Sequence, residues 1–484
     1  MPDSANRRRF LILYICCSSL VLVGIDNTGV NVALPAIQRG LHTSVSGLQW
    51  TVDAYLLTLA SGLILAGSLG DRFGRRRVFV TGLTLFTVGS ALCALAPSLG
   101  ALVGARALQG AGGAMMNPVA MSIITNVFTG SKDRPRAIGV WAAAGGISMA
   151  IGPVIGGLLL AVTDWRGIFW INVPLGLAAI AATLTLVPES KAPTARRLDP
   201  VGQVLAIVFL VGITYAIIEA PHAGWLSART GGVLAVALAS VVGLVLFELR
   251  REQPLIDPRF FSSLPFSGAT LMAVAGFMAV AGFLFMNTLY LQNTLGYSAL
   301  KTGLLMLPIA IASTLIGPRA GRYVGHHGPR RPLLLAGALF VVSALLLTRL
   351  SATTPVWVLL ASYALLGAAF GAVNPPLTNT AVAGMPRAQA GVAAAVATTS
   401  RQIGQTLGVA VLGSVVVARV HGPIGAGLPA ASHAGWWILV GCGLVVLVLG
   451  VLTTGKRAAE TAARTAERLA EPTPDLATAT PAHR

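Results

Sequence analysis

Charged side chains are scarce in this sequence. Asp, Glu, Lys and Arg make up 10% of its 484 residues, whereas about a quarter of a typical soluble domain is charged. Hydrophobic residues make up 55%, and the mean hydropathy is +0.77. So little charge cannot cover a water-exposed surface. The composition therefore excludes an ordinary soluble domain and predicts an all-α integral membrane protein.

Cysteines are few, and motifs for nucleotide or redox chemistry are absent. The four cysteines lie in apolar runs, without the spacing of a disulfide framework or a metal site: Cys16, Cys17, Cys93 and Cys442. The sequence lacks a G-x-x-x-x-G-K-[ST] phosphate loop, a nucleophile triad and a redox motif. We therefore expect no enzyme activity, no metal, no cofactor and no ATPase subunit. If the protein pumps, an ion gradient supplies the energy.

Long apolar runs dominate the sequence. A helix that crosses a bilayer needs about 20 apolar residues, and such runs follow one another almost from end to end. They predict fourteen transmembrane helices joined by short loops, near residues 10–34, 48–69, 78–97, 100–122, 137–160, 167–187, 200–219, 230–248, 268–292, 303–319, 332–350, 355–377, 391–418 and 435–454. The first run is too long for a cleavable signal peptide, so we expect it to remain as an anchor.

The net charge of +18 indicates orientation in the membrane, and not nucleic-acid binding. In the predicted topology, most of the 34 lysines and arginines lie on the same side as Arg7, Arg8 and Arg9. Arg106 and Arg401 lie inside helices. Only six basic residues lie on the opposite side: Arg39, Arg166, Arg229, Lys301, Arg349 and Arg419. Basic loops stay in the cytoplasm, so we expect both termini to be cytoplasmic. The abundance of Ala, Gly, Arg and Val indicates a GC-rich bacterial genome, so we expect the membrane to be the bacterial cytoplasmic membrane.

Two halves of the sequence match one another. Residues 104–118 align without gaps to 361–375, and residues 67–77 align to 321–331. A third match pairs Ser148, Ile151, Gly152 and Gly156 with Ser400, Ile403, Gly404 and Gly408. Carriers built from parallel repeats show such internal similarity. The matches equate helices 2 to 5 with helices 10 to 13, which leaves two extra helices between two sets of six.

This repeat divides the chain into four parts. An N-terminal six-helix bundle is predicted over residues 1–190, two extra linker helices over 191–260, and a C-terminal six-helix bundle over 261–455. The tail, 456–484, is rich in Ala, Thr and Glu. We expect this cytoplasmic tail to be disordered, with at most a short helix at its start.

Two acids and an arginine are predicted inside helices of the first half. A carboxylate there costs about 2.5–3.5 kcal/mol on insertion scales and usually marks a transport pathway. At about 1.5 Å per residue, Asp26, Asp53 and Arg106 lie at similar depth in the outer half of the membrane. Since a nearby Arg stabilises a carboxylate and apolar surroundings destabilise it, a changing distance between Asp26 and Arg106 would bind and release a proton. The alternatives are a neutral helix contact for Asp26 and an interfacial acid for Asp53.

Charge is less abundant in the second half. Arg106 aligns with Tyr363, and Asp71 aligns with Gly325. Arg401 lies inside helix 13 and has no aligned acid, so it either lines a cavity or bonds carbonyl groups at helix ends. Glu219, near the end of an extra helix, is expected to be an acid at the outer surface.

Several motifs carry a family resemblance. Residues 26–35 look like a helix 1 signature, residues 50–55 like a helix 2 opening, and residues 67–77 like the loop motif G-x-L-a-D-r-x-G-r-r. Further matches are Arg106 with Gln109, Gly110 and Gly112, then Gly152-Pro153 with Gly156-Gly157, and residues 165–176, 290–308 and 401–408. On these motifs the sequence resembles the major facilitator superfamily, and within it the 14-helix drug:proton antiporter family (DHA2, EmrB/QacA-like), along nearly the whole chain.

The resemblance implies a major facilitator fold, with two six-helix bundles plus two extra helices and fourteen transmembrane helices in all. It implies that Asp26, Arg106 and Asp53 couple protons, and that Asp53, Tyr55 and Arg401 lie near the substrate. It also implies gating and conformational roles for two groups of residues: Gly67, Asp71, Arg72, Gly74 and Arg75 in the loop, and Gly152, Pro153, Gly156 and Gly157 in helix 5. Gly325 lacks the acid of the loop motif, so no gating role is carried to the second copy.

The sequence therefore predicts a proton-coupled antiporter that exports amphipathic drugs or antibiotics by alternating access. Its partners would be a small amphipathic substrate, protons and the lipid bilayer, and we expect a monomer. A metabolite uptake symporter and a transport-dead membrane sensor are the alternatives. Gly152 and Pro153 disfavour uptake, because the family motif there is associated with exchange. The retained Asp26 and Arg106 disfavour a sensor without transport.

Overall fold

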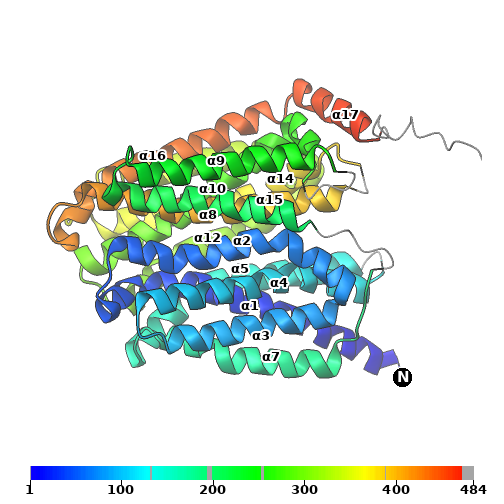
Figure 1. Cartoon of the computed structure of the whole chain (residues 1–484), viewed down its shortest axis with the longest axis horizontal. Helices are drawn as coiled ribbons and strands as arrows, with labels where there is room; N and C mark the ends of the chain where they lie inside the picture. The colour runs from blue at the N-terminus through cyan, green and yellow to red at the C-terminus, as the bar shows by residue number, and fades with distance from the viewer. Residues whose placement is uncertain (1, 131–132, 193–198, 252–255, 387–388, 471–484) are drawn as a thin grey trace, which may run out of the picture.

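Long helices lie side by side through the first part of the chain (Figure 1). The structure is a computed structural model that describes residues 2–130, 133–192, 199–251, 256–386 and 389–470. Within these ranges it contains helices and no strand. The first helices are α1 (Pro2–Leu41), α2 (Val45–Phe73), α3 (Arg75–Ala94), α4 (Leu99–Val127), α5 (Asp133–Val162), α6 (Gly167–Trp170) and α7 (Asn172–Leu186).

Two further helices, α8 (Pro200–Ala223) and α9 (Ala228–Glu248), form a hairpin before the second half begins. The remaining elements are η1 (Pro258–Ser262), α10 (Leu264–Leu289), η2 (Tyr290–Thr294), α11 (Ala299–Leu305), α12 (Leu307–His327), α13 (Arg330–Leu345), α14 (Val356–Val382), α15 (Ala390–Arg419), α16 (Ile424–Leu452) and α17 (Lys456–Ala470).

Short polar residues and glycine set several helix ends. The side chain of Ser44 accepts a hydrogen bond from the Gly47 N–H at the start of α2, and Ser98 does the same for Ala101 at the start of α4. Gly74 separates α2 from α3 with φ +110°. Glycine adopts this backbone angle at little cost, whereas other residues rarely do, which explains the sharp turn between two long apolar helices.

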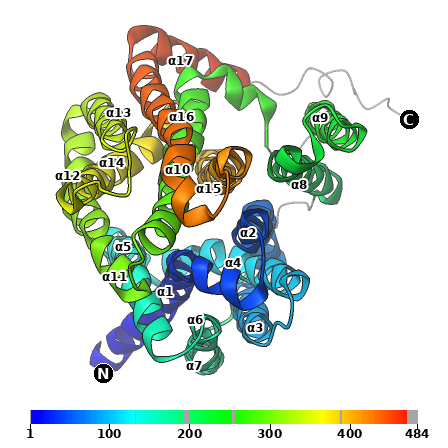
Figure 2. The same cartoon turned by 90° about the vertical axis from the view of Figure 1, so that its left-hand side faces the viewer.

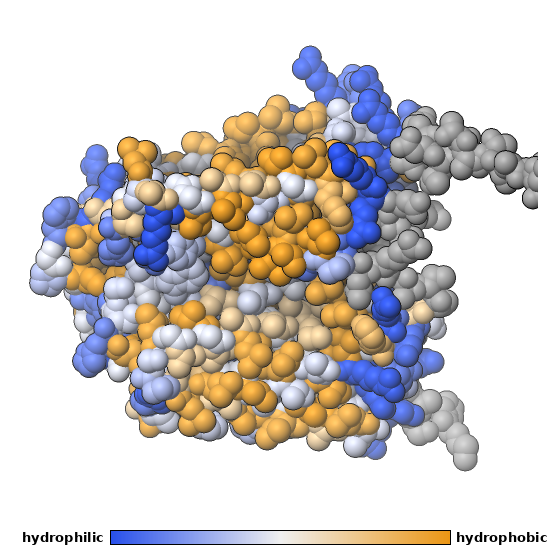
Figure 3. Space-filling view, viewed as in Figure 1, coloured by the Kyte–Doolittle hydropathy of each residue, from blue (hydrophilic) through white to orange (hydrophobic). Residues whose placement is uncertain are grey.

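The helices form an apolar band between two polar ends. Figure 3 shows hydrophobic residues over the middle of the molecule and hydrophilic residues at both ends. In the described part of the chain, eleven helical stretches are long and apolar enough to cross a bilayer, or twelve when the bent α5 is taken as one span. The protein is therefore a multi-pass membrane protein. The predicted count of fourteen is not reached by these stretches, because α4 and α13 are not among them.

The long helices run between two opposite ends of the molecule. We call the end at which α1 begins and α17 lies the terminal end, and the opposite end the far end (Figure 1). Since α1 begins at the terminal end, α2 begins at the far end, and consecutive long helices alternate in direction.

Helices of the second half pack in the same pairs as those of the first. In the first half α1 packs on α5, α2 on α4 and α3 on α4, and in the second half α10 packs on α15, α12 on α14 and α13 on α14. Figure 2 shows these two groups along the helix axes, with α8 and α9 outside them beside α2 and α15. The helices that the sequence repeat equates therefore occupy equivalent places. We call the groups α1–α7 and α10–α16 the two bundles.

Contacts between the bundles lie in the far half. Gln49 of α2 donates to the Ala410 carbonyl of α15 (2.7 Å), and Gln292 of η2 donates to the Val32 carbonyl of α1 (2.8 Å). Asn27 of α1 donates to Gln405 of α15 (3.2 Å). In the described part of the chain, no hydrogen bond joins the bundles in the terminal half. The far side is therefore the side at which this structure is closed.

The tail begins with a short helix, which the sequence prediction allowed. Residues 456–470 form α17, which packs on α10 and η1. Ala458, Ala462 and Leu469 are buried on one face of the helix, while its charged side chains lie on the other. An amphipathic face with a surface to cover explains the order. Residues 471–484 lie outside the described residues.

Candidate functional site

Asp26 and Arg106 form a buried ion pair between α1 and α4. Arg106 Nη1 lies 2.6 Å from Asp26 Oδ2, and the two side chains are 1% and 0% exposed. The helices run in opposite directions, so a residue in the far half of α1 meets a residue two turns into α4. The common depth predicted for these two residues is confirmed.

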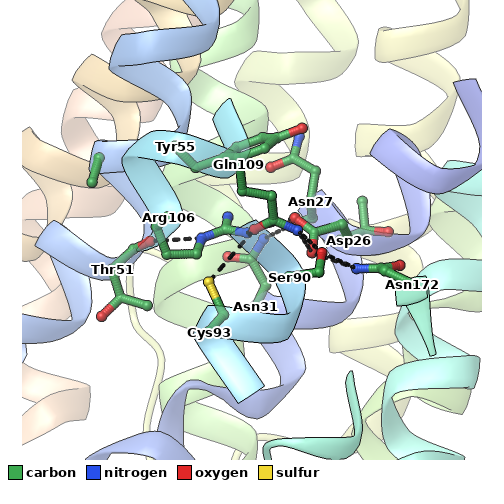
Figure 4. Close-up of polar contacts among 12 residues, drawn as sticks. Asp26, Asn27, Asn31, Thr51, Tyr55, Ser90, Cys93, Arg106, Gln109 and Asn172 are labelled. Carbon is green, nitrogen blue, oxygen red and sulfur yellow. Dashed lines mark hydrogen bonds and ion pairs between the residues drawn. The ribbon is translucent and has the colours of Figure 1, made fainter. Parts of the chain in front are cut away.

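Two amides and a hydroxyl surround the carboxylate (Figure 4). Asp26 Oδ1 accepts hydrogen bonds from Gln109 (2.8 Å) and from Asn172 (3.0 Å). The same two amides donate to Ser90 Oγ at 2.6 and 3.3 Å. The network thus joins α1, α3, α4 and α7. Because a buried charge without partners is very costly, these bonds stabilise a charged Asp26 within the bilayer.

Arg106 is held on three further sides. Its Nε donates to the Thr51 carbonyl (3.1 Å), and its Nη1 also donates to Gln109 Oε1 (2.6 Å). The guanidinium carbon lies 4.3 Å from the centroid of the Tyr55 ring, a cation–π contact. Tyr55 is fully buried and lies against α4 beside Gly113. In this structure Tyr55 therefore supports Arg106, and the substrate contact predicted for it stays a prediction.

Asp53 lies apart from this network. Its side chain is fully buried, and neither carboxyl oxygen has a hydrogen-bond partner among the described residues. Gln49, one turn earlier on the same face of α2, bonds the Ala410 carbonyl of α15. Asp53 therefore lies at the seam between α2 and α15, and not beside Arg106.

Arg401 is a cation without an acid. Its Nη2 donates to Thr378 Oγ1 (2.5 Å), and its guanidinium carbon lies 5.8 Å from the centroid of the Phe277 ring. Its Nε has no partner, and no acid among the described residues lies within ion-pair distance. The three residues come from α15, α14 and α10, so Arg401 lies within the second bundle.

The loop between α2 and α3 packs within the first bundle. Asp71 Oδ1 lies 3.1 Å from Arg75 Nη2, and the Asp71 carbonyl accepts from Ala192 N at 3.2 Å. A Cβ at Gly74 would meet the Glu189 carboxylate. Among the described residues, Asp71 therefore bonds Arg75 and Ala192 of the first half of the chain and no residue of the second bundle. The gating role of Asp71 stays a prediction.

Two other residues of that loop motif have few neighbours in this structure. A Cβ at Gly67 would meet nothing within 4 Å, so no helix approaches Gly67 closely. Arg72 is exposed, with its guanidinium 5.8 Å from the Phe73 ring and no ion pair in the described part of the chain. The gating role of Gly67 and Arg72 stays a prediction.

The glycines of α5 lie at close contacts with α1 of the first bundle and α11 of the second. A Cβ at Gly156 would lie 2.9 Å from the Gly29 carbonyl oxygen of α1, and one at Gly157 would lie 2.7 Å from the Leu300 Cα of α11. The Pro153 carbonyl contacts Gly303 of α11. α5 bends by 40° between its segments Arg136–Met149 and Ile151–Val162. Pro153 lies near this bend, and its missing N–H favours a kink.

A comparison of the sequence with known protein families agrees with this helical arrangement and with these motifs. A family model described as Major Facilitator Superfamily matches residues 16–409. This chain belongs to the Major Facilitator Superfamily. It is therefore a transporter, and not an enzyme.

Relatives within the Major Facilitator Superfamily cover most of the chain. The "Multidrug resistance protein Stp" of Mycobacterium tuberculosis is 37% identical over 413 residues, which cover 85% of this chain and 77% of the relative. The "Tetracenomycin C resistance and export protein" of Streptomyces glaucescens is 37% identical over 421 residues, covering 87% of this chain and 78% of the relative.

The overall fold is similar to that of solved transporters. A POT family transporter, solved in complex with a thioalcohol-conjugated peptide, has a TM-score of 0.67 at 15% sequence identity and covers 92% of this chain and 95% of its own. At this identity the likeness concerns the fold alone.

Sequence reasoning missed part of the network that this Major Facilitator Superfamily protein builds around Asp26. Ser90, Asn172 and the Thr51 carbonyl were not predicted there. Ser90 and Asn172 could have been predicted, because they are polar residues within apolar spans and buried polar side chains need hydrogen-bond partners. Which polar groups meet depends on how α3 and α7 pack against α1.

Proposed function

We propose that the protein is a proton-coupled antiporter that exports amphipathic drugs or antibiotics from a bacterium by alternating access. The names of its relatives support export, since they describe multidrug resistance and antibiotic export. The buried pair Asp26–Arg106, at 2.6 Å, is the observation that supports proton coupling. A small amphipathic substrate, protons and the bilayer are its partners, and it works as a monomer without a cofactor or an ATPase subunit.

The proposed orientation follows from charge. Positively charged segments remain in the cytoplasm, and most of the 34 basic residues belong to segments at the terminal end. The terminal end is then cytoplasmic, with both termini, and the far end is outside the cytoplasmic membrane. Because the bundles contact one another in the far half, this structure corresponds to the inward-facing state.

We further propose fourteen spans, as in the 14-helix drug:proton antiporter family. α4 and α13 lie among the other long helices, packed between α2 and α3 and between α14 and α16, respectively. Adding them to the twelve apolar spans, with α5 counted once, gives this number. The proposed domains keep the boundaries predicted above: bundles over 1–190 and 261–455, separated by the α8–α9 hairpin within 191–260.

Asp26 and Arg106 supply a chemical basis for exchange. As an ion pair, the carboxylate is stabilised by Arg106 and by the Gln109 and Asn172 amides. If α1 moves away from α4, the carboxylate loses its cation in apolar surroundings, and binding a proton becomes favourable. The proton that enters from outside would thus be held on an Asp26 oxygen and released to the cytoplasm when the pair forms again.

Other residues take roles in the proposed cycle. Asp53, a carboxyl without partners at the α2–α15 seam, is a second proton carrier or a selector of cationic substrates. Arg401 offers a cation inside the second bundle, and Tyr55 holds Arg106 in place. The α5 glycines permit the bundles to rock against one another, while Asp71 and its loop hold the cytoplasmic side in the outward-facing state.

Proton movement in liposomes tests this function. Protein is reconstituted into acid-loaded vesicles, and proton release is followed as cationic, neutral and zwitterionic drugs are added. Drug-triggered release in the native protein and in Asp164→Asn, an exposed acid, with none in Asp26→Asn, is the expected result. The double variant Asp26→Asn/Arg106→Gln removes both charges, and so tests coupling without leaving an unpaired buried cation.

The other outcomes separate the alternatives. Drug-triggered release with unchanged stoichiometry in Asp26→Asn would remove Asp26 from the mechanism. Protons and a metabolite moving together into the vesicle would indicate an uptake symporter. A folded protein that moves nothing in response to any compound would indicate a sensor.

A further inference from the structure

The α8–α9 hairpin contacts both bundles through α8. α8 packs on α2 of the first bundle and on α15 of the second, and α9 packs on α8. In Figure 2 the hairpin lies beside the seam between α2 and α15, outside the two bundles. A helix in this position can control whether α2 and α15 separate.

The last two turns of α8 are tied to α2 by two side-chain contacts. Trp50 Nε1 donates to Glu219 Oε1 at 3.1 Å, and Ser46 Oγ lies 3.0 Å from His222 Nε2. The Trp50 ring also packs on Tyr215, with centroids 5.9 Å apart. A hydrogen bond to a carboxylate is stronger than one between neutral groups, so Glu219 fixes the far end of α8 to α2.

The same stretch of α8 is tied to α15 by one bond. Ser414 Oγ donates to the Ile217 carbonyl at 2.6 Å. At its other end α8 bonds α2 again, where Gln203 donates to the Ser61 carbonyl. α8 is therefore attached to α2 at both ends and to α15 at one end, so it should travel with the first bundle and part from α15.

Packing between these attachments is looser. A cavity of about 50 Å³ lies where α2, α8 and α15 meet, lined by Leu57, Ala60, Phe209, Leu210, Ile213, Thr214, Ile403, Thr406 and Leu407. The cavity interrupts the packing of α15 against α2 and α8 at this level. The hydrogen bonds at the far end therefore add to the resistance to separation.

We infer that α8 is a clasp that holds α2 and α15 together at the outer side. Glu219 is a positioning residue that acts through Trp50 of α2. The bond from Ser414 of α15 to α8 is the contact that breaks when α15 separates from α8. This inference rests on the proposed orientation and deepens the proposed function. Asp53 lies one turn inward from Trp50 and Gln49, so the clasp also controls when Asp53 can meet the outside solution.

Accessibility of introduced cysteines tests the clasp. The four native cysteines are replaced by Ala, and Ala410→Cys, buried at the seam, is labelled from outside with a membrane-impermeant maleimide. Glu219→Leu removes the bond from Trp50, and Ser414→Ala removes the bond to Ile217 together with a longer one from Gln49 Nε2 (3.5 Å). In each variant the labelling rate is expected to rise about fivefold. Ser414→Thr and Glu219→Gln keep the hydroxyl donor and the oxygen acceptor, so they should label like the parent. Ser240→Ala on α9, whose hydroxyl bonds its own helix, is a matched control.

A reporter on the other side distinguishes a clasp from general loosening. Thr378→Cys, on an exposed stretch of α14, is labelled from the cytoplasmic side in inverted vesicles. Its labelling rate should fall in Ser414→Ala and Glu219→Leu, because the outward-facing state gains population. A rise from both sides, unchanged outer labelling, or an equal rise in Glu219→Gln would overturn the inference. The labelling experiment contains no drug, so its result tests the clasp alone. Drug:proton exchange is tested separately by proton release from liposomes.

Discussion

The Tyr363 hydroxyl donates a hydrogen bond of 2.9 Å to Asn287 Oδ1, and both side chains are fully buried. The bond joins α14 to α10, which correspond to α4 and α1 of the first bundle, and Tyr363 aligns with Arg106. The second bundle thus holds a neutral hydrogen bond where the first holds an ion pair. An Asn side chain has no acidic proton to exchange, so the two bundles share a packing plan and differ in chemistry.

Tyr363→Phe should affect stability and not coupling. The change leaves Asn287 Oδ1 without its donor in a buried site, which costs about 1–3 kcal/mol. We expect a lower temperature of thermal unfolding in detergent and unchanged drug-triggered proton release per folded molecule. A loss of proton release at full stability would show that the second bundle takes part in coupling.

Arg106→Lys should fail although it keeps the charge. A lysine has no planar fork with which to bond the Thr51 carbonyl, Gln109 and Asp26 together. We expect drug-triggered proton flux in liposomes to fall about tenfold or more, since losing one charged hydrogen bond is worth about 1.5–3 kcal/mol. Native flux in this variant would mean that a point charge is sufficient. Arg349→Lys, at an exposed position beyond the end of α13, provides a control for the chemical change.

Gly156→Ala should weaken the crossing of α5 and α1. The added Cβ would lie 2.9–3.0 Å from backbone atoms of Gly29, and backbone cannot rotate away as a side chain can. We expect a destabilisation of about 1–3 kcal/mol, measured by thermal unfolding, with slower drug export. Gly146→Ala on the same helix meets nothing within 4 Å and should be neutral. If the two variants lost the same stability, the cause would be the change of backbone freedom within α5 and not the crossing of α5 and α1.

Asp53→Asn should separate substrate selection from proton transfer. The amide keeps the shape of the carboxyl and cannot become negatively charged. If Asp53 selects cations, export of cationic drugs should fall about tenfold relative to neutral ones, while neutral drugs still release protons. Equal loss with every drug would instead identify Asp53 as a proton carrier. Asp199→Asn, an acid at the terminal end of α8, controls for loss of an acid elsewhere.

The sequence by itself determined the class of protein and much of its plan. Scarce charge and long apolar runs require a bilayer, because backbone and side chains of this composition cannot be covered in water. The internal repeat fixed which helices are equivalent, and helix rise alone placed Asp26 and Arg106 at one depth. These properties are periodic or additive along the chain, so they can be derived without knowing which helices touch.

Only the tertiary structure decided which side chains meet. Predicted depth also placed Asp53 with Asp26 and Arg106. In the structure, however, Asp53 lies on the face of α2 that meets α15. The Thr51 carbonyl and the Tyr55 ring of the same helix are the groups that contact Arg106. Ser90 and Asn172 join the Asp26 network from α3 and α7, and Asp71 bonds within its own bundle. Rotation of each helix about its axis sets these contacts, and that rotation results from the packing of all neighbouring helices together, a property that no single segment of the sequence contains.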